Sequence, residues 1–190
     1  DNARRNKHLG QIVSAPNMTP LEQEYEKTIT LSDGTVVLLR PELATDTEML
    51  WEMFSTLSKE SLLFLVLPFP RERVEKWTSN INYERNLTIL AVVQEPSKTR
   101  VVASASLVFK EETPLKHKAN FGITVHDDFQ NRGLGTAMTN YMIEIARKRK
   151  LQKVSLTVIT ENSRAIHIYE NCGFKIVAKL EKENFIDGKY

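Results

Sequence analysis

The chain has 190 residues, which is enough for one domain with a sizeable core. Its 26 basic and 24 acidic residues nearly balance, for a net charge of +2, so nothing in the composition demands nucleic acid or an acidic membrane as a partner. The longest apolar run is too short to span a bilayer, no signal peptide is recognised, and the single cysteine fits a reducing compartment, so we expect a cytoplasmic protein without a membrane partner.

The first part of the chain is polar and irregular. We expect residues 1–28 to form a tail or arm that contains a short helix at Leu21–Lys27, and residues 29–190 to form the domain. Turn residues and periodicity then predict the next elements. They are a strand at Thr35–Arg40, helices at Thr45–Leu57, within Ser58–Pro70 and at Arg71–Asn80, and strands at Leu87–Gln94, Arg100–Lys110 and Leu115–His126.

A turn rich in glycine follows the last of these strands. It reads Gln130-Asn131-Arg132-Gly133-Leu134-Gly135. Glycines let the backbone turn tightly and approach a ligand, and the N-terminus of the next helix directs N–H groups to the same place. We therefore expect a phosphorylated cofactor to bind here; the alternative is an ordinary turn before a helix. A P-loop is excluded because no Lys-Ser/Thr pair follows, and a dinucleotide fingerprint because Met138 replaces the third glycine.

The last part of the chain alternates again between helix and strand. Apolar residues at helical spacing from Leu134 to Ile145 predict a long helix, and alternation predicts a strand at Val154–Val158. Asn162 is a suitable N-cap for a second helix, which Gly173 can end in a left-handed turn. Alternation then predicts a strand at Phe174–Leu180, and Asp187-Gly188 suits a hairpin turn.

Two motifs carry a family resemblance. The turn fits Q-x-x-G-x-G, and residues 162–174 fit N-x-x-A-x-x-x-Y-x-x-x-G-F. Together they resemble the GCN5-related N-acetyltransferases (GNAT superfamily), and the likeness covers roughly residues 30–190. It implies an α+β fold: a twisted, mostly antiparallel sheet of six to seven strands, flanked by about four helices. The family has a further strand after the hairpin, so we expect that strand to come from beyond Tyr190 or from the second chain of a homodimer.

The resemblance also implies a chemistry. Acetyl-CoA would be the co-substrate, and an amine would attack its thioester directly, with no metal involved. The turn together with Thr136 would hold the pyrophosphate, with Arg132 adding a charge contact. Ile123, Thr124 and Val125 would bind pantetheine through the main chain, and an N–H of Val125 or a neighbour would be the oxyanion donor. The family's remaining cofactor-lining positions are Asn162, Ala165 and Tyr169.

Tyr169 is the expected general acid. A phenol with a pKa of about 10 stays protonated at neutral pH and can donate to a thiolate whose conjugate acid has a pKa of about 8.5. The alternative is a tyrosine that packs on the helix, with its hydroxyl on a nearby carbonyl.

The general base stays unassigned. Many relatives have a glutamate on the strand before the turn, and Asn120 occupies that place. The candidates left open are His117, Glu111, Glu112 and His126, or a chain of water molecules.

One segment of the sequence bears on the acceptor. Residues 57–64, "LSKESLLF", look like a segment of protein-lysine acetyltransferases, although a core-packing helix explains them equally well. In the family, the first two helices and their loop usually form the wall of the acceptor site. An apolar wall with few carboxylates would suit a peptide or a hydrophobic amine more than a polycation. We expect a protein lysine or N-terminus as acceptor. The alternatives are a small-molecule amine, a CoA sensor without turnover, and an interaction or nucleic-acid adaptor acting through Arg4, Arg5, Lys7 and the basic helix end at residues 147–150.

Overall fold

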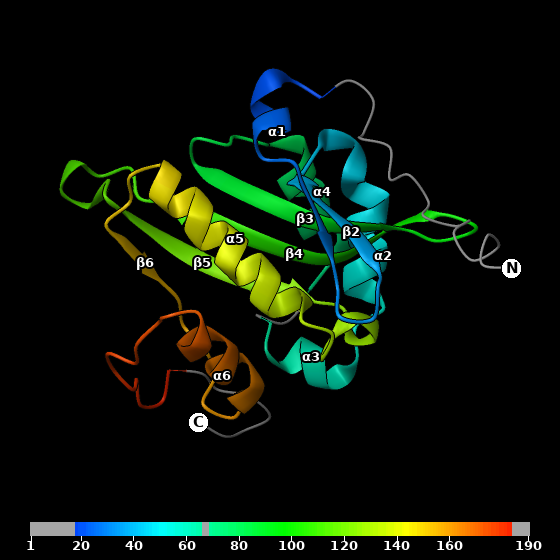
Figure 1. The fold of residues 1–190 in the computed structure, drawn as a ribbon. Helices are drawn as coiled ribbons and strands as arrows, with labels where there is room; N and C mark the ends of the chain where they lie inside the picture. The colour runs from blue at the N-terminus through cyan, green and yellow to red at the C-terminus, as the bar shows by residue number, and fades with distance from the viewer. Residues whose placement is uncertain (1–17, 66–68, 184–190) are drawn as a thin grey trace, which may run out of the picture.

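A single mixed sheet forms the centre of the molecule (Figure 1). The computed structural model describes residues 18–65 and 69–183, and all structural statements refer to these residues. Neighbouring strands pair in chain order and are antiparallel, except that β5 and β6 are parallel and are joined by a crossover through α5. The strands are β1 Lys27–Thr30, β2 Val36–Pro41, β3 Asn86–Gln94, β4 Thr99–Phe109, β5 Lys118–Val125 and β6 Lys153–Ser155.

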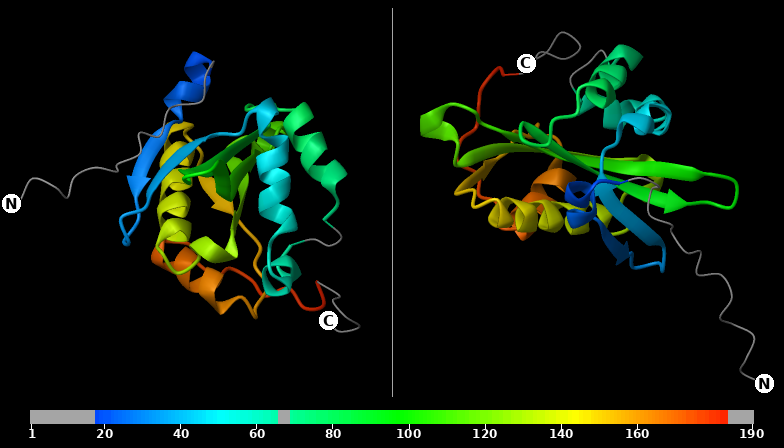
Figure 2. Two further views of the ribbon diagram at one scale, coloured as in Figure 1. Left: turned by 90° about the vertical axis from the view of Figure 1, so that its right-hand side faces the viewer. Right: turned by 90° about the horizontal axis from the view of Figure 1, so that it is seen from above.

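Helices cover both faces of this sheet. Seen from above, α2, α3 and α4 lie on one side and α5 and α6 on the other (Figure 2). The helices are α1 Pro20–Glu24, α2 Thr47–Ser55, α3 Lys59–Leu63, α4 Arg71–Ser79, α5 Leu134–Lys148 and α6 Ser163–Asn171. This arrangement confirms the α+β fold expected from the family resemblance, with six strands and more helices than the expected four.

The central strands explain why the core has two halves. In β3, Leu87, Ile89, Ala91 and Val93 pack in the cluster that contains α5, whereas Leu90 and Val92 pack in the cluster that contains α2. Successive side chains of a strand point to opposite faces, so a strand covered on both faces must be apolar throughout. The continuous apolar run from residue 89 to residue 93 meets this requirement.

The sheet opens between β5 and β6. The two strands pair only over Lys118–Asn120 and Lys153–Ser155, and β5 then continues to Val125 without β6 beside it. β6 ends at Ser155, so the strand expected at Val154–Val158 begins one residue earlier and ends three residues earlier than predicted. The gap left by this separation positions the site described below.

The N-terminal part of the chain contributes more to the domain than the sequence indicated. The short helix α1 begins at a capping box formed by Thr19 and Glu22. Met18 and Tyr25 are buried, and β1 pairs with β2 along its whole length. The boundary expected at residue 28 therefore falls inside an edge strand that was not predicted.

The strand expected at Phe174–Leu180 does not form, and this prediction was wrong. Alternation in sequence produces a strand only where a neighbouring backbone and an apolar surface receive it. Here Ile176 and Val177 are 71% and 89% exposed, and Leu180 is also exposed. The expected Asp187-Gly188 turn lies outside the described residues, and the homodimer stays a prediction.

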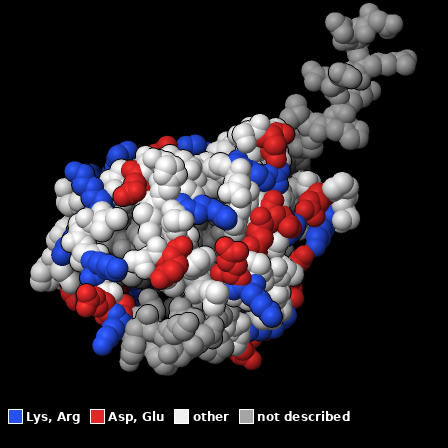
Figure 3. Space-filling model, turned by 90° about the horizontal axis from the view of Figure 1, so that it is seen from below, with Lys and Arg blue, Asp and Glu red and all other residues white. Residues whose placement is uncertain are grey.

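The face of the molecule seen from below has no patch of charges of a single sign among its described residues. Acidic and basic side chains are interspersed there (Figure 3). Among the helices of the described segments, none combines the length and the apolar character that a bilayer crossing needs.

Candidate active site

A cleft of about 1340 Å³ begins where β5 and β6 separate and continues to the α2–α4 face of the sheet. Most residues expected to bind the cofactor lie along it, although they come from β5, the glycine turn, α5 and α6. Those that line the cleft are Ile123, Thr124, Val125, Gln130, Asn131, Gly133, Gly135, Thr136, Asn162, Ala165 and Tyr169. Cofactor binding by these residues stays a prediction.

The glycine turn presents main-chain N–H groups to the cleft. Asn131 and Gly133 both have left-handed backbones, with φ of 59° and 84°, and Gly133 is the N-cap of α5. A glycine has no side chain to cap the helix, so the N–H groups of its first turn at Leu134, Gly135 and Thr136 have no acceptor within the helix. The partial positive charge of the helix N-terminus lies at the same place. These N–H groups suit an anionic ligand.

The side chains of two predicted residues point elsewhere. Arg132 donates hydrogen bonds to Asp33 (2.6 Å) and Thr35 (2.6 Å) in the β1–β2 turn, and its guanidinium stacks 4.5 Å from the ring centre of Phe129. Leu134 is fully buried in the core. Both residues can therefore serve an anion in the cleft only through the main chain.

A different arginine, Arg164, places its side chain beside the glycine turn. It stands in the first turn of α6, lines the cleft, and donates a hydrogen bond to the side chain of Gln130. Sequence reasoning missed this arginine, because only the packing of α6 beside the turn brings it to the cleft. The N-cap role expected for Asn162 is confirmed, since its side chain accepts the N–H of Ala165 at 3.1 Å.

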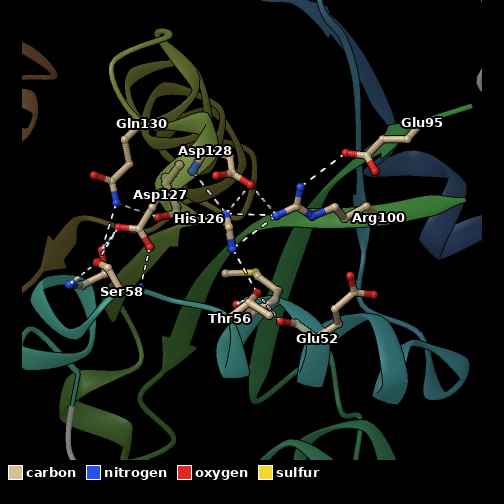
Figure 4. Close-up of polar contacts among 12 residues, drawn as sticks. Glu52, Thr56, Ser58, Glu95, Arg100, His126, Asp127, Asp128 and Gln130 are labelled. Atoms are coloured by element: carbon tan, nitrogen blue, oxygen red, sulfur yellow. Dashed lines mark hydrogen bonds and ion pairs between the residues drawn. The ribbon is translucent and has the colours of Figure 1, made fainter.

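Gln130 connects three segments of the cleft wall. Its side-chain amide donates to the carbonyl oxygen of Val125 (3.0 Å) and to the hydroxyl of Ser61 (3.1 Å). It thereby joins the end of β5 to α3, and Figure 4 shows Gln130 beside Asp127 and Ser58.

Asp127 fixes α3 from the same loop. Its carboxylate accepts the N–H and the hydroxyl of Ser58 (2.8 and 2.7 Å) and the hydroxyl of Ser61 (2.7 Å). Burial alone would raise the pKa of Asp127, but these hydrogen bonds outweigh it and hold the pKa below its ordinary value. Because Ser58 also caps α3, the serines of the "SKES" segment are explained by structure alone.

This contact predicts a pH-dependent effect of replacing Asp127. The lowered pKa stabilises the folded state above the ordinary carboxyl pKa, and the contribution disappears as the pH falls through the lower, folded-state value. Asp127→Asn is therefore expected to reduce the free energy of unfolding by about 1–3 kcal/mol at pH 7 and by much less in strong acid. Urea unfolding at both pH values measures this. Glu60→Gln, at an exposed carboxylate of α3, is the control, and an equal effect of both variants would contradict the assignment.

The end of β5 directs part of its main chain into the cleft. The N–H of His126 donates to Val102 on β4 at 2.9 Å, which fixes the alternation of the β4–β5 ladder. Thr124 therefore points its N–H towards β4, whereas Ile123 and Val125 point theirs to the opposite side, where β6 has separated. Of the three residues expected to bind through the main chain, these two have suitably directed N–H groups.

Tyr169 reaches the cleft from α6. Its ring packs edge-on against Phe121 (6.1 Å between centres) and Phe174 (5.9 Å), and burial raises its pKa to about 12. Within the described segments its hydroxyl has no carbonyl partner, and the general-acid role of Tyr169 stays a prediction.

The base candidates from the sequence lie away from the cleft. His126 is buried between Arg100 and Thr56, with ring nitrogens 3.1 and 3.0 Å from their side chains (Figure 4). It holds the start of the loop and does not line the cleft.

The other three candidates are on the surface. Glu111 forms an ion pair with Arg85 at 2.7 Å, and His117 and Glu112 are exposed. None of the three lines the cleft.

The sheet contributes a carboxylate that the sequence did not reveal. Glu42, directly after β2, is 5% exposed and lines the cleft. Burial raises its pKa to about 7; a hydrogen bond from Thr88 opposes this rise and the nearby Asp46 adds to it. A glutamate after a strand is normally a surface residue, so no local signal indicated its burial.

The opposite wall is aromatic. Phe54 and Phe69 stack with ring centres 4.4 Å apart, and Trp77 meets both rings edge-on. All three line the cleft together with the carboxylates of Glu42 and Glu60. This wall is more acidic than the sequence analysis expected.

Comparisons with known proteins can be set beside this geometry. Residues 48–174 match the model of the "Acetyltransferase (GNAT) family". The chain is 31% identical over 91 residues to L-amino acid N-acetyltransferase AaaT of Escherichia coli (47% of this chain, 56% of that protein). It is 29% identical over 99 residues to spermidine N(1)-acetyltransferase of Vibrio cholerae (52% and 56%). The chain thus spans about half the length of these curated relatives.

Solved structures show the same fold. The GNAT domain of S. lividans PAT superposes with a TM-score of 0.70 at 22% identity, covering 87% of this chain and 93% of that one. Spermidine N-acetyltransferase from Vibrio cholerae in complex with CoA and spermine gives a TM-score of 0.67 at 21% identity, covering 81% and 89%.

Proposed function

The chain belongs to the GNAT acetyltransferase family, and from this premise we propose that it transfers the acetyl group of acetyl-CoA to a primary amine in a ternary complex. One observation carries the proposal: the uncapped N-terminus of α5, the opening between β5 and β6, and Tyr169 all border the same cleft. The helix N-terminus suits a diphosphate, and the opening between the strands suits an extended pantetheine arm. The phenol of Tyr169 suits a leaving thiolate.

The residues present fit acetyl-CoA. The N–H groups of Leu134, Gly135 and Thr136 would hold the diphosphate, with Arg164 as a charged neighbour. A Cβ on Gly135 would make ordinary contacts with Ile168 (3.4 Å) and Val125 (3.8 Å), so the start of α5 lies directly beside α6 and the end of β5. Ile123 and Val125 would hold the pantetheine arm through their main chains.

The residues have distinct roles in the proposed reaction. When bound, acetyl-CoA supplies an activated thioester. The N–H of Ile123 or Val125 polarises its carbonyl, and a donor of this kind contributes about 3–4 kcal/mol in other acyl-transfer enzymes. Tyr169 donates its proton to the departing sulfur.

The acceptor must also lose a proton before it attacks. For an alkyl ammonium with a pKa of about 10.4, this costs roughly 4.6 kcal/mol at pH 7. The candidate bases expected from the sequence do not line the cleft, so we assign this step to water in the cleft.

We propose a small-molecule amine as the acceptor. The curated relatives described above are named for L-amino acids and spermidine, which supports this choice. The "SKES" segment does not favour a protein lysine, because its serines have a structural role. Ser58 and Ser61 donate hydrogen bonds to Asp127, and Ser61 accepts one from Gln130. Free-thiol release from acetyl-CoA with a panel of amines, and mass spectrometry of the products, tests the proposal. CoA binding without turnover on any amine would favour the sensor, and no CoA binding would refute both.

A matched pair of glycine variants tests the cradle. Gly133 and Gly34 have nearly the same left-handed φ (84° and 85°), and no heavy atom lies within 4 Å of a Cβ built on either. Replacement of either by alanine is expected to cost about 1–2 kcal/mol of stability. Only Gly133→Ala should also weaken CoA binding, by about tenfold, because it shifts the N–H groups of the cradle. Calorimetry measures the affinity; equal affinity of the two variants would contradict the site.

A further inference from the structure

Two buried oxygen atoms in the cleft have no hydrogen-bond donor. They are Oε1 of Glu42 and Oδ1 of Asn86, and neither has a partner among the described residues. Both residues line the cleft, and Glu42 is 5% exposed. A buried acceptor without a donor is costly, by about 1–3 kcal/mol and more for a charged group. The cleft therefore contains a place where a donor is expected.

Both oxygen atoms belong to residues on the face of the sheet that α2 and α4 cover, because Glu42 and Asn86 alternate in phase with Leu38 and Leu90. The N–H of Glu42 donates to the carbonyl of Thr88 at 2.9 Å, and Thr88 is in register with Ser106, which is in register with Gly122. These residues form one row across four strands. Three strand spacings amount to roughly 14 Å, so Glu42 is too far from Gly122 and the end of β5 to take a proton directly from the amine that reacts there.

No cation of the described chain neutralises Glu42. The nearest buried guanidinium, Arg40, is held by Asp46 through two hydrogen bonds of 2.7 Å. The hydroxyl of Tyr83 donates to the main-chain oxygen of Glu42 (2.7 Å) and to Glu22 (2.9 Å), not to the Glu42 carboxylate. The raised pKa of Glu42 agrees with a carboxylate that lacks a positive partner.

The surroundings suit a cation. Trp77 lines the cleft with Glu42 and Asn86, and it packs with Phe54 and Phe69. Aromatic faces attract ammonium groups, by about 0.5–2 kcal/mol depending on desolvation. Asn86 lies two residues before Thr88 on the same face of β3 and is therefore a diagonal neighbour of Glu42. An ammonium carries three N–H donors and a positive charge, so a single group between the two residues can donate to both orphaned oxygens and neutralise the carboxylate.

We propose that Glu42 and Asn86 bind a second ammonium group of the acceptor, at a distance from the amine that is acetylated. The acceptor class is therefore a diamine or a longer polyamine. This inference rests on the proposed acetyl transfer and specifies its substrate. The hydroxyl-lined row from Glu42 to Gly122 would accommodate the chain between the two nitrogen atoms.

A matched pair of amines and a matched pair of variants test the proposal. Octamethylenediamine and octylamine have the same chain, but only the diamine has a second ammonium. Glu42→Gln removes the charge with little change in shape, and Glu60→Gln does the same at an exposed carboxylate of the cleft wall. Initial rates give kcat and KM for both amines. Calorimetry of octamethylenediamine on the CoA-loaded protein gives binding without turnover.

The expected result is selective. Glu42→Gln should raise KM for octamethylenediamine, and weaken its binding, at least tenfold, while kcat and the kinetics of octylamine change less than twofold. Glu60→Gln should have little effect, and thermal unfolding checks that both variants are folded. Equal losses with the two amines would overturn the proposal and point to a role of Glu42 in proton transfer. Diamine binding that depends on Glu42 without any turnover would leave the ammonium site standing and refute acetyl transfer.

Discussion

Replacing Tyr169 by phenylalanine is expected to lower kcat by a factor of about 10²–10⁴, the range by which a positioned general acid accelerates a reaction. Tyr169 lines the cleft from α6, and its pKa of about 12 keeps the phenol protonated at neutral pH. Without it, the thiolate would have to leave unprotonated or take a proton from water. Rapid-mixing measurement of thiol release with saturating amine reads this step.

Tyr141 provides the control for this prediction. Burial also raises its pKa to about 12, but it lies on α5 outside the cleft, and its hydroxyl donates to the carbonyl of Tyr25 at 2.9 Å. Tyr141→Phe should lose about 1 kcal/mol of stability and keep its turnover. Tyr169→Phe should keep its stability and its CoA affinity, because its hydroxyl holds no residue of the described chain. Full turnover by Tyr169→Phe would remove the acid role.

Replacing Asp46 by alanine is expected to reduce the free energy of unfolding by about 3–5 kcal/mol. Arg40 and Asp46 are 4% and 1% exposed, and the carboxylate also accepts the N–H of Leu43 at 2.7 Å. Its removal leaves a buried guanidinium without a counter-charge and loosens the turn that begins α2. Urea unfolding measures the loss.

Two further variants separate burial from ion pairing. Glu75 forms an exposed ion pair with Arg71 at 2.9 Å, and Glu75→Ala should cost no more than about 0.5 kcal/mol. The double variant Arg40→Met/Asp46→Leu should recover most of the stability lost by Asp46→Ala, because it removes both buried charges. A loss from Asp46→Ala as small as that from Glu75→Ala would show that water reaches the buried pair.

Local sequence signals predicted most of the fold. The apolar run in β3, the alternation in β4, the helical spacing in α5, and the cap residues Asn162 and Gly173 act over a few consecutive residues, and the structure shows these elements where they were expected. The short strand β1 was missed because four residues carry little periodicity. The strand expected at Phe174–Leu180 failed for the opposite reason, since its periodicity has no neighbouring backbone to pair with.

Some features of the candidate site also follow from local sequence, whereas others depend on tertiary packing. The sequence by itself determined the left-handed turn at Gly133 with its bare helix N-terminus, and the tyrosine one helix turn beyond Ala165, because backbone geometry and helical phase depend on adjacent residues. Only the tertiary structure turned Arg132 away to Asp33, brought Arg164 and Gln130 together, and buried Glu42 without a partner. Charge pairing and burial depend on segments far apart in the chain, and their meeting is decided by how the sheet and helices pack.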